Sequence, residues 1–189
     1  MKFKLAVDDQ DKEKFNYIIK TYHSYVPTIS TVGRSLKWLI YDDADLYTIL
    51  GAISLGSSTY PPCKDFLRYL NITKFEYKKI FNQFANNNRF CLCVKRKNLG
   101  TQVLKELRHQ APIEWKKKYN NDLKYLITFV GGGHHGAIYK ADNWTHIGFT
   151  SGLPSHKSIS MKWDTGTKLK QNFVKPTGEN KKMIFIKEL

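Results

Sequence analysis

The segment LKYLITFVGGGHHGAIYKADNW, residues 123–144, decides how this chain can fold. It opens on an apolar run rich in β-branched and aromatic residues, 123–130, which predicts a buried strand. Clustered glycines end the strand and predict a loop over 131–136. The residues at 137–144 predict a helical turn, and a short strand is expected at 145–150. The segment therefore predicts a strand, a glycine-rich loop, a helical turn and a second strand.

The rest of the chain shows further helical and strand periodicities. An acidic first turn suits the positive end of a helix dipole near the N-terminus. Pro112 is expected to end a helix, because proline lacks the N–H that a helix interior needs. The expected elements are a helix at 8–25, a hairpin of strands at 35–41 and 47–56, one or two short helices within 65–85, a turn at Asn86–Asn88, a strand at 89–94, a helix at 103–110, a short basic helix at 113–119 and a closing strand at 183–186.

Elements in this order predict an α+β fold with a mixed central sheet flanked by helices, and not a regular alternation of strands and helices. At 189 residues the chain is long enough for one sizeable core. We expect residues 1–150 to form this core. Residues 151–189 are basic and rich in Gly and Ser, and we expect them to form an extension that ends in a strand and packs on the same domain.

The charge of the chain points to a polyanionic partner. Its 31 Lys and Arg against 16 Asp and Glu give a formal net charge of +15. A surface of this sign attracts nucleic acid, and DNA is the first partner to consider. A lysine-rich coding bias is the alternative explanation of the same composition.

Neither a membrane span nor a disulfide framework is expected. No run of about 18 apolar residues occurs, and the first residues lack the apolar core of a signal peptide. We expect a soluble, cytoplasmic protein, in the host cytoplasm if a phage encodes it. The three cysteines, Cys63, Cys91 and Cys93, are an odd number with poor disulfide spacing and too few ligands for a zinc site. We interpret them as small buried apolar residues.

The loop that precedes the helix at 103–110 has the features of a phosphate cradle. Gly100 lets the backbone approach a ligand closely, and a helix N-terminus offers N–H groups to an anion. A basic loop that only caps the helix would carry the same residues. The candidate cofactor-binding residues are Lys95, Arg96, Lys97, Asn98, Leu99, Gly100, Thr101 and Gln102.

The glycine-rich loop at 131–136 is a second candidate site, because loops at strand ends commonly carry functional residues. Its histidines, with Tyr139 and Asn143, provide groups for proton transfer or for hydrogen bonds to a base. A flexible turn with surface histidines is the alternative. Adjacent His134 and His135 point apart in extended backbone, so a metal site would need help from elsewhere, and we expect none. His23 is either a helix cap or a wall of the site.

The run GHHGAIYKADNW at 133–144, with Gly148 four residues further on, resembles the signature of phage Mom-type DNA modification proteins. These are a divergent branch of the acyl-CoA N-acyltransferase (GNAT) superfamily. The run also resembles the related Druantia DruA-like defence family. The similarity covers about residues 15–152, and its specificity lies in the order of the segments. The segments that follow the pattern upstream are 22–25, 33–40, 50–53, 88–90 and 98–104.

This resemblance implies a GNAT-like fold, acetyl-CoA or a related acyl-CoA as cofactor, and DNA as partner. Mom-like proteins are implicated in placing a carbamoylmethyl group on the exocyclic amine of adenine, which shields phage DNA from restriction. A DNA-modifying transferase is therefore the implied function. Arg89, Thr101 and Tyr139 match positions treated as functional in that family. The family commonly carries an Asp after the strand at 123–130, where this chain has Gly131, so an acid needed there must come from another residue.

Two kinds of candidate residue follow. The catalytic candidates are Arg89, Thr101, Tyr139, His23, His135 and Asn143. An aromatic side chain could stack on a base flipped out of the duplex, and the basic tail could hold phosphates. The candidate nucleic-acid-binding residues are Trp144, Lys157, Lys162, Lys168 and Lys170. The alternatives are a non-enzymatic DNA-binding component of a DruA-like defence system, and an ordinary N-acyltransferase for proteins or small amines.

Overall fold

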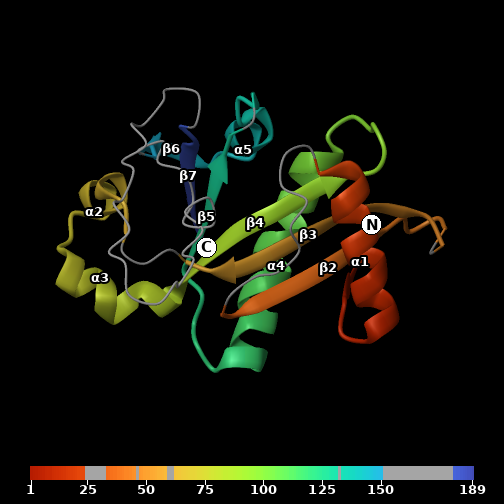
Figure 1. Ribbon diagram of the computed structural model, residues 1–189, viewed down its shortest axis with the longest axis horizontal. Helices are drawn as coiled ribbons and strands as arrows, with labels where there is room; N and C mark the ends of the chain where they lie inside the picture. Colours follow the sequence, from red (N-terminus) through yellow and green to blue (C-terminus); the bar gives the residue numbers. More distant parts are fainter. Residues whose placement is uncertain (24–32, 46, 59–61, 132, 151–180) are drawn as a thin grey trace, which may run out of the picture.

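A computed structural model describes residues 1–23, 33–45, 47–58, 62–131, 133–150 and 181–189. It contains one mixed sheet of seven strands in the order β1-β2-β3-β4-β5-β7-β6, with helices on both faces (Figure 1). The strands are β1 (Lys2–Leu5), β2 (Ser35–Tyr41), β3 (Ile49–Ser57), β4 (Phe84–Leu92), β5 (Tyr125–Val130), β6 (Thr145–Phe149) and β7 (Met183–Glu188). The helices are α1 (Asp9–Tyr22), α2 (Lys64–Leu70), α3 (Lys74–Ile80), the short 3-10 turn η1 (Phe81–Gln83), α4 (Leu99–Tyr119) and α5 (Ala137–Ala141). The predicted α+β fold with a mixed central sheet is confirmed, and no helix among these residues is both long and apolar enough to cross a membrane.

The first four strands form an antiparallel meander. The predicted hairpin is β2 and β3, which pair from Ser35 opposite Gly56 to Tyr41 opposite Ile49. Strand β1 was not predicted. It has only four residues, and as an edge strand it turns Lys2 and Lys4 to solvent while Phe3 and Leu5 are half-buried. So short an alternation carries little sequence signal.

The predicted turn at Asn86–Asn88 is wrong, because these residues lie in the middle of β4. Asparagine favours turns when its amide competes for the backbone. In β4 the chain instead adds one extra residue, Asn88, opposite β3, where the register shifts between Ser54 and Leu55. Such a bulge bends a strand and re-aims its side chains. The bulge thus fits three asparagines into a strand.

Helix α4 runs through Pro112, so the prediction that Pro112 ends the helix is also wrong. A proline inside a helix costs about 3 kcal/mol. Ala111 and Trp115 on either side of it are fully buried in the main core, and so are four apolar residues earlier in the helix. Burial of this face outweighs the lost hydrogen bond, and the segments at 103–110 and 113–119 form one helix.

The second half of the sheet is closed by the C-terminal strand. β5 pairs with β4 in parallel, while β7 lies between β5 and β6 and is antiparallel to both. β7 is fully apolar at its centre, where Ile184, Phe185 and Ile186 are buried. Residues from the two ends of the described chain therefore share one sheet.

The two faces of the sheet carry different helices. Alternation of side chains along β4 and β5 places Ala85 and Leu126 in the core under α4, which runs behind the sheet in Figure 1. Phe84 and Ile127 join the core under α2 and α3 on the opposite face. Helix α1 covers that same opposite face over β2 to β4, through a third cluster that includes Cys91. We call these the α4 face and the α1 face.

Candidate active site

Strands β4 and β5 part shortly after they meet. Their parallel pairing runs only from Phe84 opposite Tyr125 to Asn86 opposite Ile127. β4 then continues to Leu92 and β5 to Val130. We call the space between the diverging strands the fork. Beyond Asn86 and Ile127, the facing edges of β4 and β5 no longer pair with each other. The N-terminus of α4 follows β4 after the loop at 93–98, so it lies at the β4 end of the fork.

Three buried polar side chains close the apex of the fork on the α4 face. Tyr139 donates a hydrogen bond from its hydroxyl to Oδ1 of Asn87 at 2.8 Å. Thr128 Oγ1 donates to the carbonyl oxygen of Asn87 at 3.0 Å, in place of the ladder that has just ended. All three are less than a tenth exposed. Buried polar groups are stable only when they are hydrogen-bonded, so this network fixes the point where the strands separate.

The orientation of the Asn87 amide is set by the backbone. Its Nδ2 donates to the carbonyl oxygens of Ser54 at 3.1 Å and of Arg89 at 3.4 Å. Oδ1 must therefore face Tyr139. The next residue, Asn88, turns to the α1 face, where its Oδ1 accepts from Ser54 Oγ at 2.7 Å. The neighbouring amides of Asn87 and Asn88 thus lie on opposite faces, as alternation along a strand requires.

The N-terminus of α4 is open to an anion. Its N-cap Asn98 is left-handed, with φ of 59°, and forms no side-chain cap. The first N–H groups of a helix have no acceptor within the helix. The Leu99 N–H uses the carbonyl of Arg96, while Thr101 turns its hydroxyl to the carbonyl of Asn98 at 2.9 Å. The next N–H groups, in the first turn, point out of the helix end.

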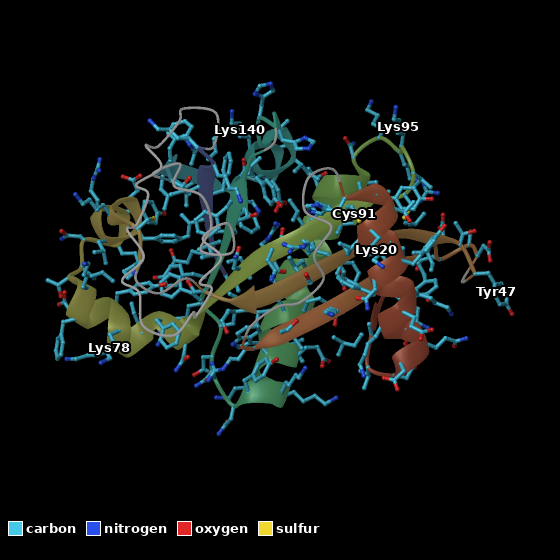
Figure 2. The ribbon with its side chains drawn as sticks, in the orientation of Figure 1. Lys20, Tyr47, Lys78, Cys91, Lys95 and Lys140 are labelled. Carbon is cyan, nitrogen blue, oxygen red and sulfur yellow. The ribbon has the colours of Figure 1, made fainter. Side chains whose placement is uncertain are left out.

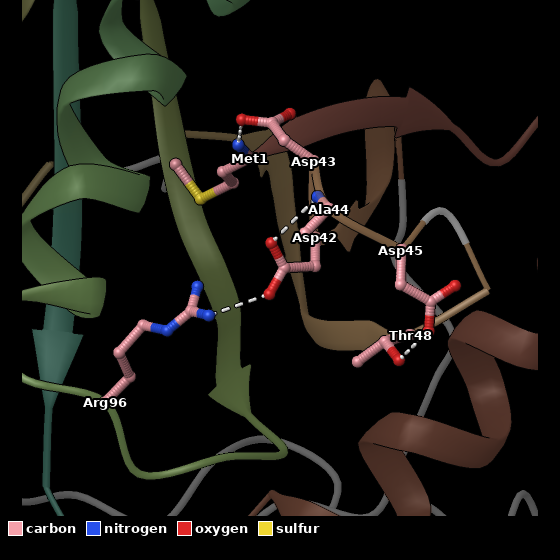
Figure 3. A network of polar contacts seen from close by, with 7 residues as sticks. All are labelled: Met1, Asp42, Asp43, Ala44, Asp45, Thr48 and Arg96. Carbon is pink, nitrogen blue, oxygen red and sulfur yellow. Dashed lines mark hydrogen bonds and ion pairs between the residues drawn. The ribbon is translucent and has the colours of Figure 1, made fainter.

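The predicted cofactor residues divide by exposure. Lys95, Lys97 and Gln102 are exposed. Leu99 is buried in the core, so only its backbone could face a ligand. Arg96 donates from Nη2 to Asp42 Oδ2 at 2.8 Å and so ties the loop to the β2–β3 turn (Figure 3).

Gly100 has a structural role in addition to any role in binding. A Cβ at this position would lie 2.0 Å from Cδ1 of Ile138 in α5. Glycine is therefore needed for α4 and α5 to pack at this end of the fork. Further along, Arg108 of α4 forms an ion pair with Asp142, the C-cap residue of α5, and so joins the same two helices.

Basic side chains gather on the α1 face of the fork. Arg89 lies beyond the bulge, and it donates from Nη1 to the carbonyl of Asn88 at 2.5 Å. Burial lowers the pKa of His23, and the nearby charges of Arg89 and His134 lower it further. Burial and the charge of Arg89 also lower the pKa of Lys182. The charge of Arg89 thus acts on both residues, and Arg89 and Lys182 place positive charge on the α1 face of the fork.

Lys182 occupies the space of a missing side chain. A Cβ on Gly131 would lie 2.8 Å from Cγ of Lys182. The position that carries an Asp in the related family thus faces a lysine here. Sequence reasoning missed Lys182, because only the pairing of β7 with β5 brings it beside Gly131.

The remaining candidates fall in different places. His23 caps the end of α1, where its N–H donates to the carbonyl of Ile19, and His135 is exposed before α5. Asn143 forms the left-handed turn after α5, and its carbonyl accepts from Lys187. The proposal that Trp144 stacks on a base is wrong: the ring is 4% exposed and its Nε1 donates to Asp142 Oδ2 at 2.9 Å. The tail residues Lys157, Lys162, Lys168 and Lys170 lie outside the described residues, and their DNA contacts stay a prediction.

Prediction from the sequence also missed two residues of the apex. Asn87 was assigned to a turn, and Thr128 was treated as part of an apolar strand. A lone polar residue in the run LITFV is the signal that could have marked Thr128. Among the residues that the structure describes, no group of three His, Cys, Asp or Glu side chains could hold a metal ion.

Comparison with known families assigns the chain. The family model of Druantia protein DruA matches residues 2–183. The chain belongs to the DruA family. No curated protein matches this DruA-family chain in sequence. Resemblance to the Mom-type branch in particular stays a prediction.

Solved structures described as acetyltransferases share the fold of this chain. A Bacillus subtilis acetyltransferase in complex with CoA has a TM-score of 0.54 at 8% identity, over 100% of this chain and 98% of that one. An N-acetyltransferase from Staphylococcus aureus Mu50 has a TM-score of 0.52 at 9% identity, over 99% and 96%. Tetrahymena GCN5 has a TM-score of 0.50 at 11% identity, over 100% and 96%. The DruA-family chain therefore has the GNAT fold; at these identities the likeness concerns the fold alone.

Proposed function

We propose that this DruA-family protein is an acyl-CoA N-acyltransferase whose acceptor is an amine of a nucleobase in DNA. The observation that carries the proposal is the fork between β4 and β5, which opens beside the uncapped N-terminus of α4. The acetyltransferase of the same fold from Bacillus subtilis is described in complex with CoA. In this chain, the backbone edges of β4 and β5 that face the fork lie outside the β4–β5 ladder. The N-terminus of α4 beside them offers N–H donors.

The residues of the α4 end fit the phosphates of an acyl-CoA. The first-turn N–H groups and the positive end of the helix dipole favour an anion. Lys95 and Lys97 are exposed beside them, while Arg96 holds the loop in place through Asp42. A bound acyl-CoA would supply a thioester-activated acyl group. The role of the protein is to hold the phosphates of the acyl-CoA and to position the acceptor amine.

The acceptor side supports an anionic substrate. Arg89 of β4 and Lys182 next to β7 lie on the α1 face of the fork, and His23 lies near Arg89. Phosphates of a nucleic acid next to these residues would position the strand without reading its sequence. Adenine is the acceptor that the Mom-like resemblance suggests. Attack of its amine on the thioester carbonyl would form an N-acyl bond and release the CoA thiol, whereas a carbamoylmethyl group, joined through a CH2, would need a different donor.

The reaction depends mainly on how the acceptor amine is positioned. The lone pair of an adenine amine is delocalised into the ring, so the amine is a weak nucleophile and must be held close to the acyl carbon. Tyr139 lies at the apex, where its hydroxyl donates to Asn87 and lies 3.5 Å from Thr128 Oγ1. Its hydroxyl therefore suits a structural role, in which it fixes the two strands between which the ligands would be held.

Mass spectrometry of nucleosides tests the proposal. DNA from cells that express the protein is digested, and a heavier adenine nucleoside is expected. Arg89→Ala should abolish this product while the protein stays folded. Lys117→Ala is the control, because this lysine is exposed near the C-terminal end of α4, on the other face of the sheet from Arg89. Unmodified DNA from cells with abundant, folded wild-type protein would refute the proposal.

A second candidate is a DNA-binding component of a defence system without transferase activity. Gly131 favours it, because this position provides no carboxylate to act as a base. Acetyl-CoA then should leave the melting temperature unchanged, whereas DNA should raise it. A clear rise with acetyl-CoA alone would instead favour the transferase.

A further inference from the structure

Helix α3 presents a surface on which cations and an aromatic ring alternate. Phe75 is 68% exposed, although large apolar side chains usually avoid solvent. Lys79 places its ammonium 4.6 Å from the centre of the Phe75 ring. Lys74 and Lys78 follow the adjacent stripe of the helix at i, i+4 spacing, and both are exposed. Lys74, Phe75, Lys78 and Lys79 are called the α3 stripe below.

Helix α3, which carries the stripe, is fixed by a capping box and by a buried tyrosine. Thr73 and Glu76 form a reciprocal capping box at the start of α3. Tyr77, on the opposite side of the helix, is fully buried, and its hydroxyl is 2.7 Å from Ser58 Oγ. The exposed side of α3 therefore does not face the core of the protein, and Figure 2 shows Lys78 on its outer edge.

Among the described residues, the acids near the stripe form no ion pair with its lysines within 4 Å. The carboxylate of Glu76 accepts from the backbone N–H and the hydroxyl of Thr73, and these hydrogen bonds, with the charge of Lys79, lower its pKa. Asp65 of α2 pairs with Arg68 and also accepts from the Phe149 N–H. Exposed Tyr69 of α2 adds a second aromatic side chain. The α2–α3 end of the molecule thus offers positive charge together with exposed rings.

We infer that the α3 stripe is a docking surface for single-stranded nucleic acid. Proteins bind single strands by combining lysines along the phosphates with aromatic rings on which bases stack. Only an unstacked base can reach Phe75, so the ring selects a single strand over a duplex. The stripe lies on the same face of the sheet as Arg89, since Phe84 and Tyr77 share a cluster there. The inference that the α3 stripe binds a single strand rests on the proposed function only in taking nucleic acid as the partner.

Binding of the full chain to a fluorescent oligothymidylate, without any CoA, tests this inference. The double variant K74A/K78A should weaken binding about tenfold and reduce the slope of log K against log salt by about 1.4, because each of the two phosphate contacts contributes about 0.7 to that slope. Phe75→Ala should weaken binding at least about fivefold and leave the slope unchanged, because stacking does not release counterions. Phe75→Ala should also remove the preference for the single strand over a duplex.

Matched controls are K105A and K117A on α4, both exposed lysines on the other face. They should bind within about twofold of wild type. The inference is overturned if the α3 variants bind like wild type, or if the α4 variants lose as much. It is also overturned if polyglutamate binds as tightly as the oligonucleotide. These outcomes do not depend on whether the protein modifies DNA, because the experiment measures binding and no turnover.

Discussion

The hydroxyl of Tyr139 lies 2.8 Å from Oδ1 of Asn87 and donates its proton to it. The amide of Asn87 cannot turn away, because Nδ2 is bound to two backbone carbonyls. Tyr139 also stacks on Phe185 and meets Trp144 edge-on, so its ring is held as well. Residues from β4, β5, β7 and α5 are thus fixed together where the fork begins.

Tyr139→Phe should lower the free energy of unfolding by about 1–3 kcal/mol, because it leaves the buried Oδ1 of Asn87 without a donor. Urea unfolding measures this loss. Tyr17→Phe is the control, since Tyr17 is 65% exposed, and it should change the free energy by no more than about 0.5 kcal/mol. Equal stability of Tyr139→Phe and wild type would show that the hydrogen bond contributes nothing.

Gly148→Ala should destabilise the protein by about 1–3 kcal/mol. Gly148 has φ of 148°, and an added Cβ would lie 2.2 Å from Oδ2 of Asp65. That carboxylate accepts from the Phe149 N–H, so the clash would separate α2 from β6. Gly133→Ala is the matched control: its φ is 80°, yet no atom lies within 4 Å of the added Cβ. Thermal unfolding should show the larger loss for Gly148→Ala, and the reverse order would contradict the packing argument.

His23 should make the fold less stable in mild acid. Its pKa is lowered in the folded protein, mainly by burial, so the unfolded chain binds more protons as pH falls. The stability that this provides is complete above about pH 6.5, the ordinary pKa of histidine, and is lost as pH falls through the lower folded value. Melting temperatures between mild base and mild acid should therefore fall less for His23→Gln than for wild type. Exposed His109→Gln should follow wild type, and parallel curves for His23→Gln and wild type would exclude the effect.

Cys91 should resist alkylation while the protein is folded. Burial raises the pKa of its thiol to about 12, and the thiolate is the reactive form. Half-buried Cys63 and Cys93 should react with iodoacetamide before Cys91 does, and all three should react in urea. Peptide mass spectrometry gives the order. Fast labelling of Cys91 in the folded protein would contradict its burial.

The fold was largely predictable from local patterns. The run at 123–130, the hairpin around 42–45 and the two helices after Pro62 are strong periodic or turn signals, and each formed an element near its expected bounds. The errors arose where tertiary contacts outweigh local preference. Asn87 is stable in a strand because Ser54, Arg89 and Tyr139 satisfy its amide, and Pro112 is stable in a helix because its neighbours are buried.

The site was predictable only in part. Tyr139 and Arg89 came from the resemblance, and the structure brings them to opposite faces of β4 at the fork. Lys182 reaches Gly131 through strand pairing across about fifty residues, which no local pattern reports. Trp144 was misread because an aromatic side chain in a polar context is equally suited to a core or to a base, and only burial distinguishes the two.

The position of β7 affects how the chain can fold during synthesis. β6 has its place in the sheet only through β7, and β7 also supplies the partner of β5. Once β1 to α4 have been synthesised, strands β1 to β4 can form their own contacts and β5 can then pair with β4, but the other edge of β5 and the whole of β6 gain a strand partner only with residues 183–188. Until then the edge of β5 that faces β7 is unpaired, and an unpaired strand edge can pair with a second copy of the chain.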